Sequence, residues 1–292
     1  MCLSTFHDRA WVTNNADNSV SVIDCGTDTV ETTIPVGLRP TAVAFDPQAG
    51  VFIANTGDGT ITVLRPDGEH TVVTVDSGPA GVDVVPIGLA NLHSSGLLVV
   101  INRDGGVARI EHGQLANPAF FVDGGEGLPF AGGPRSPHGV AAAPGLNPFV
   151  YVSSPANERV SVFDTSSGFP RRRAEIRVGQ RPLGVATHPR QPTAYVTNDI
   201  SASVSVLRGD DLVETISVGD HPHALAVGPD DRLWVAHGTG AISQIDVFSR
   251  TVVATLDVGA QLEGIIVSQV TGKAYVACRD ENTVIAIDPV DG

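Results

Sequence analysis

The sequence predicts an all-β protein: a β-propeller of seven blades, each with four antiparallel strands, folded as one domain over residues 1–292. Two observations predict it. A four-residue element of the type Tyr-Val-Thr-Asn occurs seven times, and an apolar-alternating run follows each copy. Gly and Pro then recur where the chain must turn. The resulting unit of four short strands spans about forty residues, which is typical of a propeller blade.

The four-residue element supplies the second strand of each predicted blade. Its aromatic and β-branched residues alternate with small or polar ones, as in a strand. One large residue per blade at a single register is expected to pack between blades rather than to form a ligand cage. The seven copies begin at Trp11, Phe52, Val99, Tyr151, Tyr195, Trp234 and Tyr275.

The remaining strands follow in a fixed order. An alternating run that closes with Asp, such as residues 160–164, supplies the third strand, and a run that ends in Val-Gly, such as residues 212–219, supplies the fourth. An x-Pro-x segment then begins the innermost strand of the next blade. Only six first and fourth strands are clear. We expect residues 3–6 to form the innermost strand of the first blade. The last blade is then three-stranded, or it is completed by the N-terminus.

The composition limits the partners and the compartment. There are 18 Lys and Arg against 32 Asp and Glu, a formal net charge of −14, so nucleic acid is not an expected partner. No apolar stretch is long enough for a signal peptide or a membrane span. The three Cys residues lack metal-ligand spacing. We therefore expect a cytoplasmic monomer with no membrane partner, although removal of a signal peptide stays open.

The repeats resemble a known family. The segment AYVTNDISASVSVLRGDDLVETISVGDHPHALAVGPDD is similar to the YVTN-repeat family of seven-bladed propellers, which includes surface-layer and periplasmic YncE-like proteins. The likeness covers nearly the whole chain. It implies the fold, and it implies that ligands bind on the face that carries the loop after each Tyr-Val-Thr-Asn element.

The rim of that face carries residues that the repeat does not require, and function is expected there. His138, His223 and Glu263 occupy the same x-Pro-x offset in three blades, and rotational symmetry should direct them toward one axis. With His221 and His237 they form a candidate acid–base set. The alternative is a group of polar residues that line a water-filled channel.

Candidate substrate-binding residues surround this set. Arg39 and Arg181 could hold a carboxylate or phenolate, because a guanidinium donates a planar pair of hydrogen bonds. Leu183 offers an apolar patch, and Arg103 and Arg279 belong to the second ring of the same face.

Two insertions interrupt the repeat. One, DGGEGLPFAGGPR with Phe130, is either a lid over the channel or an ordinary surface loop. The other is expected at residues 86–96, on the opposite face, after a first strand that begins near Pro79.

A second, more distant resemblance concerns the rim. SPHGVAAAP and HPHALAVGP are similar to the Pro-His-Gly and Pro-His-Ala segments that carry the working residues of virginiamycin B lyase-like propellers, where Mg²⁺ binds nearby. His223 matches the position of a catalytic His in that pattern. The next blade of that pattern reads Glu-Pro-His-Gly, whereas this chain has Gln261-Leu262-Glu263-Gly264. The departure argues against the same elimination but leaves a site of related layout.

The sequence therefore favours a small-molecule enzyme of non-redox type: a lyase, isomerase or cyclase with an acid–base site at the mouth of the central channel. A divalent metal such as Mg²⁺ could assist, with His138, His223 and Glu263 as candidate ligands. The alternative is a non-catalytic scaffold that binds a protein or small ligand on its top face. Haem or quinone chemistry has little support, since the chain has no Cys-x-x-Cys-His and a single Met.

Overall fold

The computed structural model describes residues 2–4, 8–46, 49–74, 86–92, 97–102, 107–111, 114–115, 138–143, 149–166, 171–259 and 261–289. Everything below refers to these residues. They form strands and turns without a helix, so no helix long enough to cross a membrane is found among them.

The strands form antiparallel sheets of consecutive segments. The first sheet contains β1 (Cys2–Ser4), β2 (Arg9–Asn14), β3 (Ser19–Asp24) and β4 (Thr29–Pro35). The second contains β5 (Pro40–Asp46), β6 (Gly50–Asn55), β7 (Thr60–Leu64) and β8 (His70–Thr74). The third contains β9 (Pro86–Leu92), β10 (Leu97–Asn102), β11 (Val107–Glu111) and β12 (Gln114–Leu115).

The second half of the chain continues the pattern. The fourth sheet contains β13 (Val140–Ala142), β14 (Phe149–Ser154), β15 (Arg159–Asp164) and β16 (Arg171–Arg177). The fifth contains β17 (Pro182–Thr187), β18 (Thr193–Asn198), β19 (Ser203–Arg208) and β20 (Asp211–Ser217). The sixth contains β21 (Pro222–Val227), β22 (Arg232–His237), β23 (Ala241–Asp246) and β24 (Thr251–Asp257). The last contains β25 (Leu262–Val267), β26 (Ala274–Cys278) and β27 (Thr283–Ile287).

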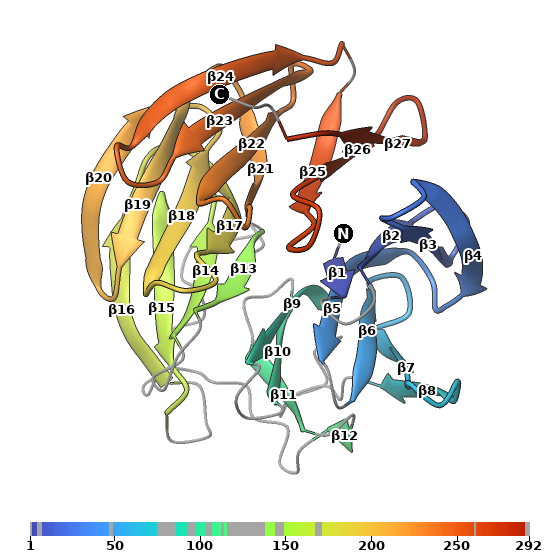
Figure 1. Ribbon diagram of the computed structural model, residues 1–292. Helices are drawn as coiled ribbons and strands as arrows, with labels where there is room; N and C mark the ends of the chain where they lie inside the picture. Colours follow the sequence, from blue (N-terminus) through green and yellow to red (C-terminus); the bar gives the residue numbers. More distant parts are fainter. Residues whose placement is uncertain are drawn as a thin grey trace.

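The sheets surround a common axis, with their first strands innermost (Figure 1). Contacts between first strands run from β1 through β5, β9, β13, β17, β21 and β25 and return to β1. The predicted all-β propeller with four-stranded antiparallel blades is therefore confirmed. Six complete blades of this kind are described, whereas β25–β27 is a sheet of three strands. β1 pairs with β2, as expected for the innermost strand of the first blade.

The third sheet corrects one prediction from the sequence. Pro86 pairs with Asn102, as Pro40 pairs with Asn55 in the second sheet. The first strand of the third sheet thus begins at Pro86 and not near Pro79. Residues 86–92, which we expected to belong to an insertion, are the innermost strand, because the segment Pro-Ile-Gly carries the same turn-and-strand chemistry as the other x-Pro-x segments.

The core lies between neighbouring sheets. One cluster joins Tyr195 and Val206 of the fifth sheet to Leu225 and Leu233 of the sixth. The aromatic repeat position supplies Tyr195 to this cluster and Trp234, which is only 1% exposed, to the cluster between the sixth sheet and the last. Truncation of such a side chain to Ala costs about 3–5 kcal/mol. The interpretation of this position as packing between blades is confirmed for the buried members Phe52, Tyr151, Tyr195, Trp234 and Tyr275.

Two further repeat positions stabilise individual blades. Asn198 donates from Nδ2 to the hydroxyls of Ser203 (3.1 Å) and Ser205 (2.9 Å) on the third strand. The glycine of the Val-Gly pair makes room for this amide: a Cβ on Gly179 would lie 2.7 Å from the Asn198 side chain. The same arrangement recurs with Gly37 and Asn55. The Val-Gly ending is therefore explained by packing.

The ring closes between the last sheet and the first through side chains. The buried Tyr275 hydroxyl donates to the Cys25 carbonyl (3.0 Å) and lies 2.7 Å from Asp28 Oδ1. Lys273 Nζ pairs with Asp28 Oδ2 at 2.6 Å, and Ser268 Oγ donates to Asp8 Oδ1. These bonds join residues more than 240 positions apart in the sequence.

Candidate functional site

The third residue of the repeated element fixes the rim. Thr197 Oγ1 accepts a hydrogen bond from the Gly184 amide (2.8 Å) in its own sheet and donates to the His223 carbonyl (3.0 Å) in the next. Ser153 makes the equivalent bonds with Gly139 (2.8 Å) and with the Leu183 carbonyl (2.6 Å). In these two places the hydroxyl thus holds the residue after the x-Pro step of the neighbouring blade at the channel mouth.

The strands β5, β17 and β21 each begin with a proline, and the residue before that proline has a left-handed backbone. The φ angles of Arg39, Arg181 and His221 are 52°, 54° and 53°. Such angles are uncommon outside glycine and cost about 1–3 kcal/mol. They recur in three blades, so they belong to the turns that start β5, β17 and β21 and not to one site.

His138 and His223 meet at the channel mouth. Their ring centroids are 5.8 Å apart and the rings are nearly perpendicular, with an interplanar angle of 86°. The His138 side chain stays exposed to the channel, but the surrounding protein removes much of its water. This loss of hydration lowers the pKa of His138, and the nearby His223 lowers it further, whereas Glu263 raises it. The structure therefore brings His138, His223 and Glu263 to one mouth.

Two arginines complete this mouth. Arg181 is close enough to lower the pKa of His138, and Arg279 Nη1 lies 3.6 Å from Glu263 Oε2. Both were predicted to belong to this face from their place in the repeat.

One functional candidate was missed: Asp199. Its side chain is 3% exposed and accepts a hydrogen bond from Arg181 Nη1 at 2.9 Å, while His221 Nδ1 lies 3.2 Å from its other oxygen. Asp199 directly follows the Tyr-Val-Thr-Asn element, at the offset of Arg103 and Arg279. The signal was present, but only cations were considered at that offset. Asp199 orients both Arg181 and His221.

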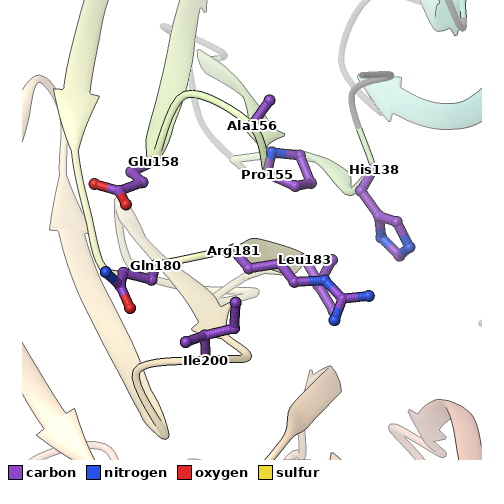
Figure 2. A pocket seen from close by; sticks show the side chains of 8 residues that line it. All are labelled: His138, Pro155, Ala156, Glu158, Gln180, Arg181, Leu183 and Ile200. Atoms are coloured by element: carbon purple, nitrogen blue, oxygen red, sulfur yellow. The ribbon is translucent and has the colours of Figure 1, made fainter. Parts of the chain in front are cut away.

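A groove opens beside the mouth, between the fourth and fifth sheets (Figure 2). It has a volume of about 520 Å³. Leu183 lies in its floor and is 2% exposed, so it offers only an edge to a ligand. The groove is lined by His138, Pro155, Ala156, Glu158, Gln180, Arg181, Leu183 and Ile200.

His237 does not belong to the site, which corrects the prediction from the sequence. Its side chain is fully buried, with Nδ1 2.9 Å from the Asp220 carbonyl and Nε2 2.8 Å from Ser243 Oγ. It occupies the register of the repeated Asn and makes the same type of bond to the third strand as Asn198 does. The fourth residue of the repeated element, at the end of the second strand, points into the blade, and this is why it cannot reach the channel.

The other candidates stand apart from this cluster. Among the described residues, nothing joins the Arg39 side chain to His138, His223 or Glu263. Arg103, Phe130 and the predicted lid at residues 123–135 lie outside the described part of the chain.

The described residues contain no group of three His, Cys, Asp or Glu that could hold a metal ion. The imidazoles of His138 and His223 face one another edge to face, and the Glu263 carboxylate is engaged by Arg279. In this arrangement the three side chains therefore do not form a metal-binding group.

Comparison with known proteins supports the fold. No family model and no curated protein sequence match the chain. Among solved structures, a streptogramin B lyase has a TM-score of 0.77 at 13% identity and covers 97% of this chain and 90% of its own. Hydrazine synthase of Kuenenia stuttgartiensis gives 0.75 at 13%, covering 99% and 94%. Virginiamycin B lyase from Staphylococcus aureus gives 0.69 at 14%, covering 99% and 93%. At these identities the likeness shows a shared propeller fold.

Proposed function

We propose that this chain is a small-molecule enzyme of non-redox type, most specifically a lyase, with an acid–base site at the channel mouth. The observation that carries the proposal is the perpendicular pair of His138 and His223 beside Glu263 and Arg181, where His138 and Arg181 also line the groove. Two structural neighbours are lyases, although they share only the fold. Isomerase and cyclase chemistry would use the same proton transfers.

The environment suggests a role for each group. Lost hydration keeps His138 unprotonated near neutral pH, so it can accept a proton from a substrate. His223, at 5.8 Å between ring centroids, can return a proton to the leaving group. Arg181 is held by Asp199 through one nitrogen, and its other nitrogens have no partner in the described part of the chain. They can donate to an oxygen that gains negative charge during proton removal.

The proposal includes a seven-bladed propeller in which β25–β27 is the seventh blade. β25 contacts both β21 and β1, which is the position of a first strand in the ring. The alternative, a non-catalytic scaffold, predicts that a ligand binds on the same face without turnover. The enzyme and the scaffold therefore differ in whether the histidines transfer protons.

The test is untargeted mass spectrometry of a metabolite extract, with streptogramin B as an added probe. Wild-type protein is compared with His138→Ala, His223→Ala and the control His70→Ala, which alters an exposed residue of β8. A species consumed by wild type and by the control should be consumed at least about a hundredfold more slowly by either site variant. Melting temperatures should be nearly unchanged, because a rim imidazole contributes little to core packing.

Two outcomes contradict the proposal. In one, no compound is consumed by the wild type and spared by the site variants, which favours the non-catalytic scaffold. In the other, His223→Ala lowers the melting temperature sharply while consumption continues, which makes His223 a structural residue.

A further inference from the structure

The outer part of the groove contains polar groups that the acid–base site does not use. Glu158 and Gln180 lie at one end, whereas His138 and the Arg181 guanidinium lie at the other (Figure 2). Pro155 and Ala156 form one wall between these ends. Ile200 faces them and is 59% exposed, so its side chain is accessible to a molecule bound in the groove.

Backbone hydrogen bonds hold the walls in place. Ile200 and Asp199 donate to the carbonyls of Gln180 (3.3 Å) and Arg181 (3.0 Å), and Gln180 donates to Ser201 Oγ (2.8 Å). On the other side, Val178 donates to the Glu158 carbonyl at 3.0 Å. The groove is therefore preformed, which reduces the entropy that a ligand loses on binding.

The two ends differ in charge. At the inner end, Arg181 keeps donors free after it has bonded to Asp199, so this end attracts a hydrogen-bond acceptor. At the outer end, Glu158 has only Arg177 as a described partner, at 3.4 Å, and the Arg177 side chain is 78% exposed. A pair this exposed is worth little, so Glu158 can exchange it for another cation. The Gln180 side-chain amide has no hydrogen bond within the described residues.

We infer that the groove binds an elongated molecule with a carboxylate or carbonyl at its inner end, an apolar middle of several carbons, and an ammonium group at its outer end. The acceptor pairs with Arg181, the carbons cover Ile200 and Pro155, and the ammonium pairs with Glu158 and Gln180. This inference names the substrate class for the same mouth, and in that respect it rests on the proposed function. A molecule without a cationic end would leave Glu158 with only its pair to the exposed Arg177, which is worth little, and would gain nothing at this end of the groove.

The experiment measures binding without turnover. Ligand-observed NMR titrations compare 6-aminohexanoate, hexanoate and hexylamine on wild-type protein. For ligands this small a Kd near the millimolar range is expected. 6-Aminohexanoate should bind about threefold to fivefold more tightly than either one-ended probe, which is the size of an exposed to half-buried ion pair.

Variants identify the two ends. Glu158→Gln should remove the advantage of 6-aminohexanoate over hexanoate and leave hexanoate unchanged. Arg181→Gln should weaken both carboxylates and leave hexylamine unchanged. Glu175→Gln is the matched control: Glu175 is also an arginine-paired carboxylate of the fourth sheet, on β16 outside the groove, and its substitution should change nothing.

Equal binding of the three probes, an equal effect of Glu158→Gln and Glu175→Gln, or no binding of any probe at up to about 50 mM would overturn the inference. Its failure is separable from that of the proposed function. If the histidine variants abolish turnover while the groove variants change neither probe binding nor KM, the acid–base site stands and the ligand class is wrong. If the probes bind as expected and no turnover depends on the histidines, the reverse holds.

Discussion

At the scale of single residues, three imidazoles have lost part or all of their hydration. Burial is the largest cause that lowers the pKa of His138, His188 and His237 below the usual 6.5. His188 is fully buried, with Nε2 3.0 Å from Asp231 Oδ1 and Nδ1 accepting from the Arg190 amide at 3.1 Å. That acceptance requires an unprotonated Nδ1, so this ring is neutral in the folded protein. The fold therefore selects neutral histidines.

We expect the free energy of unfolding to decrease as the pH falls from about 6.5. In that range the unfolded chain takes up protons on these three residues while the folded chain does not, so stability rises with pH until the unfolded histidines have lost their protons. The decrease should end below the folded pKa values. Urea unfolding followed by tryptophan fluorescence between about pH 8 and pH 5 measures it.

His237→Asn serves as the control for this pH dependence. Asn occupies the same position in four other blades, as Asn14, Asn55, Asn102 and Asn198, so the fold should accept it. The variant should lose part of the pH dependence. The aspartates with lowered pKa, such as Asp24 and Asp246, titrate below 3.8 and do not contribute in this range. An unchanged slope in the variant would contradict the role given to His237.

Individual site residues were partly predictable. His138, His223 and Glu263 share one offset, and a rotational repeat necessarily directs equal offsets to one axis. His237 was misplaced because a histidine replaces the usual asparagine at this repeat position. The position along the strand still decides where the side chain points, and side chains at this position point into the blade. Asp199 was missed because only cations were considered at its offset, although that offset placed it on this face. Its contacts with Arg181 and His221 join different turns and become visible only in the structure.

At the scale of the element, the first strands approach one another closely around the channel. A Cβ on Gly184 of β17 would lie 2.6 Å from the His223 carbonyl oxygen on β21. On Gly264, at the equivalent position of β25, a Cβ would meet nothing within 4 Å. Two glycines with the same place in the repeat thus have different surroundings.

Gly184→Ala should therefore destabilise the protein by about 1–3 kcal/mol, because the backbone of β17 or β21 must move. Gly264→Ala should change stability by less than about 0.5 kcal/mol or raise it slightly. Chemical unfolding of both variants measures this. Similar effects of the two substitutions would show that the approach of β17 to β21 is not tight.

The strands themselves were predictable wherever alternation and turn residues agreed. The third sheet was the exception. Pro79 and Pro86 both precede apolar residues, and only pairing with the second strand shows that Pro86 matches Asn102. Alternation gives the direction of side chains along a strand but does not decide which of two prolines starts it.

At the scale of the whole molecule, the ring is closed by side chains of β26 and of the turn between β3 and β4. The Tyr275 hydroxyl bonds to Cys25 and Asp28 across this junction. Burial and the neighbouring Asp28 raise the pKa of Tyr275, so its hydroxyl remains a donor at all moderate pH values.

Tyr275→Phe should lower the free energy of unfolding by about 1–3 kcal/mol, because the Cys25 carbonyl loses a buried donor. Tyr195→Phe is the matched control: Tyr195 occupies the same repeat position, but its hydroxyl has no hydrogen bond within the described ranges. Calorimetry of the two variants gives the comparison. Equal losses would mean that the junction hydrogen bonds add nothing to closure.

The propeller fold was predictable as a whole because the four-residue element of the second strand occurs seven times in the sequence. The number of complete blades was less certain: six have four strands, and the last sheet has three. A sequence shows how many units are encoded, whereas the strands that pair at the junction depend on contacts between the ends of the chain.

The hydroxyl bridge from one blade to the rim of the next affects which substitutions such a protein can accept during evolution. Thr197 and Ser153 donate to the main-chain carbonyls of His223 and Leu183, and these hydrogen bonds do not depend on which side chain the two residues carry. The scaffold therefore fixes where a rim residue stands but not what it is. Substitutions at this offset can alter the chemistry of the mouth at little cost to folding, and duplicated blades can diverge in specificity while they keep a common frame.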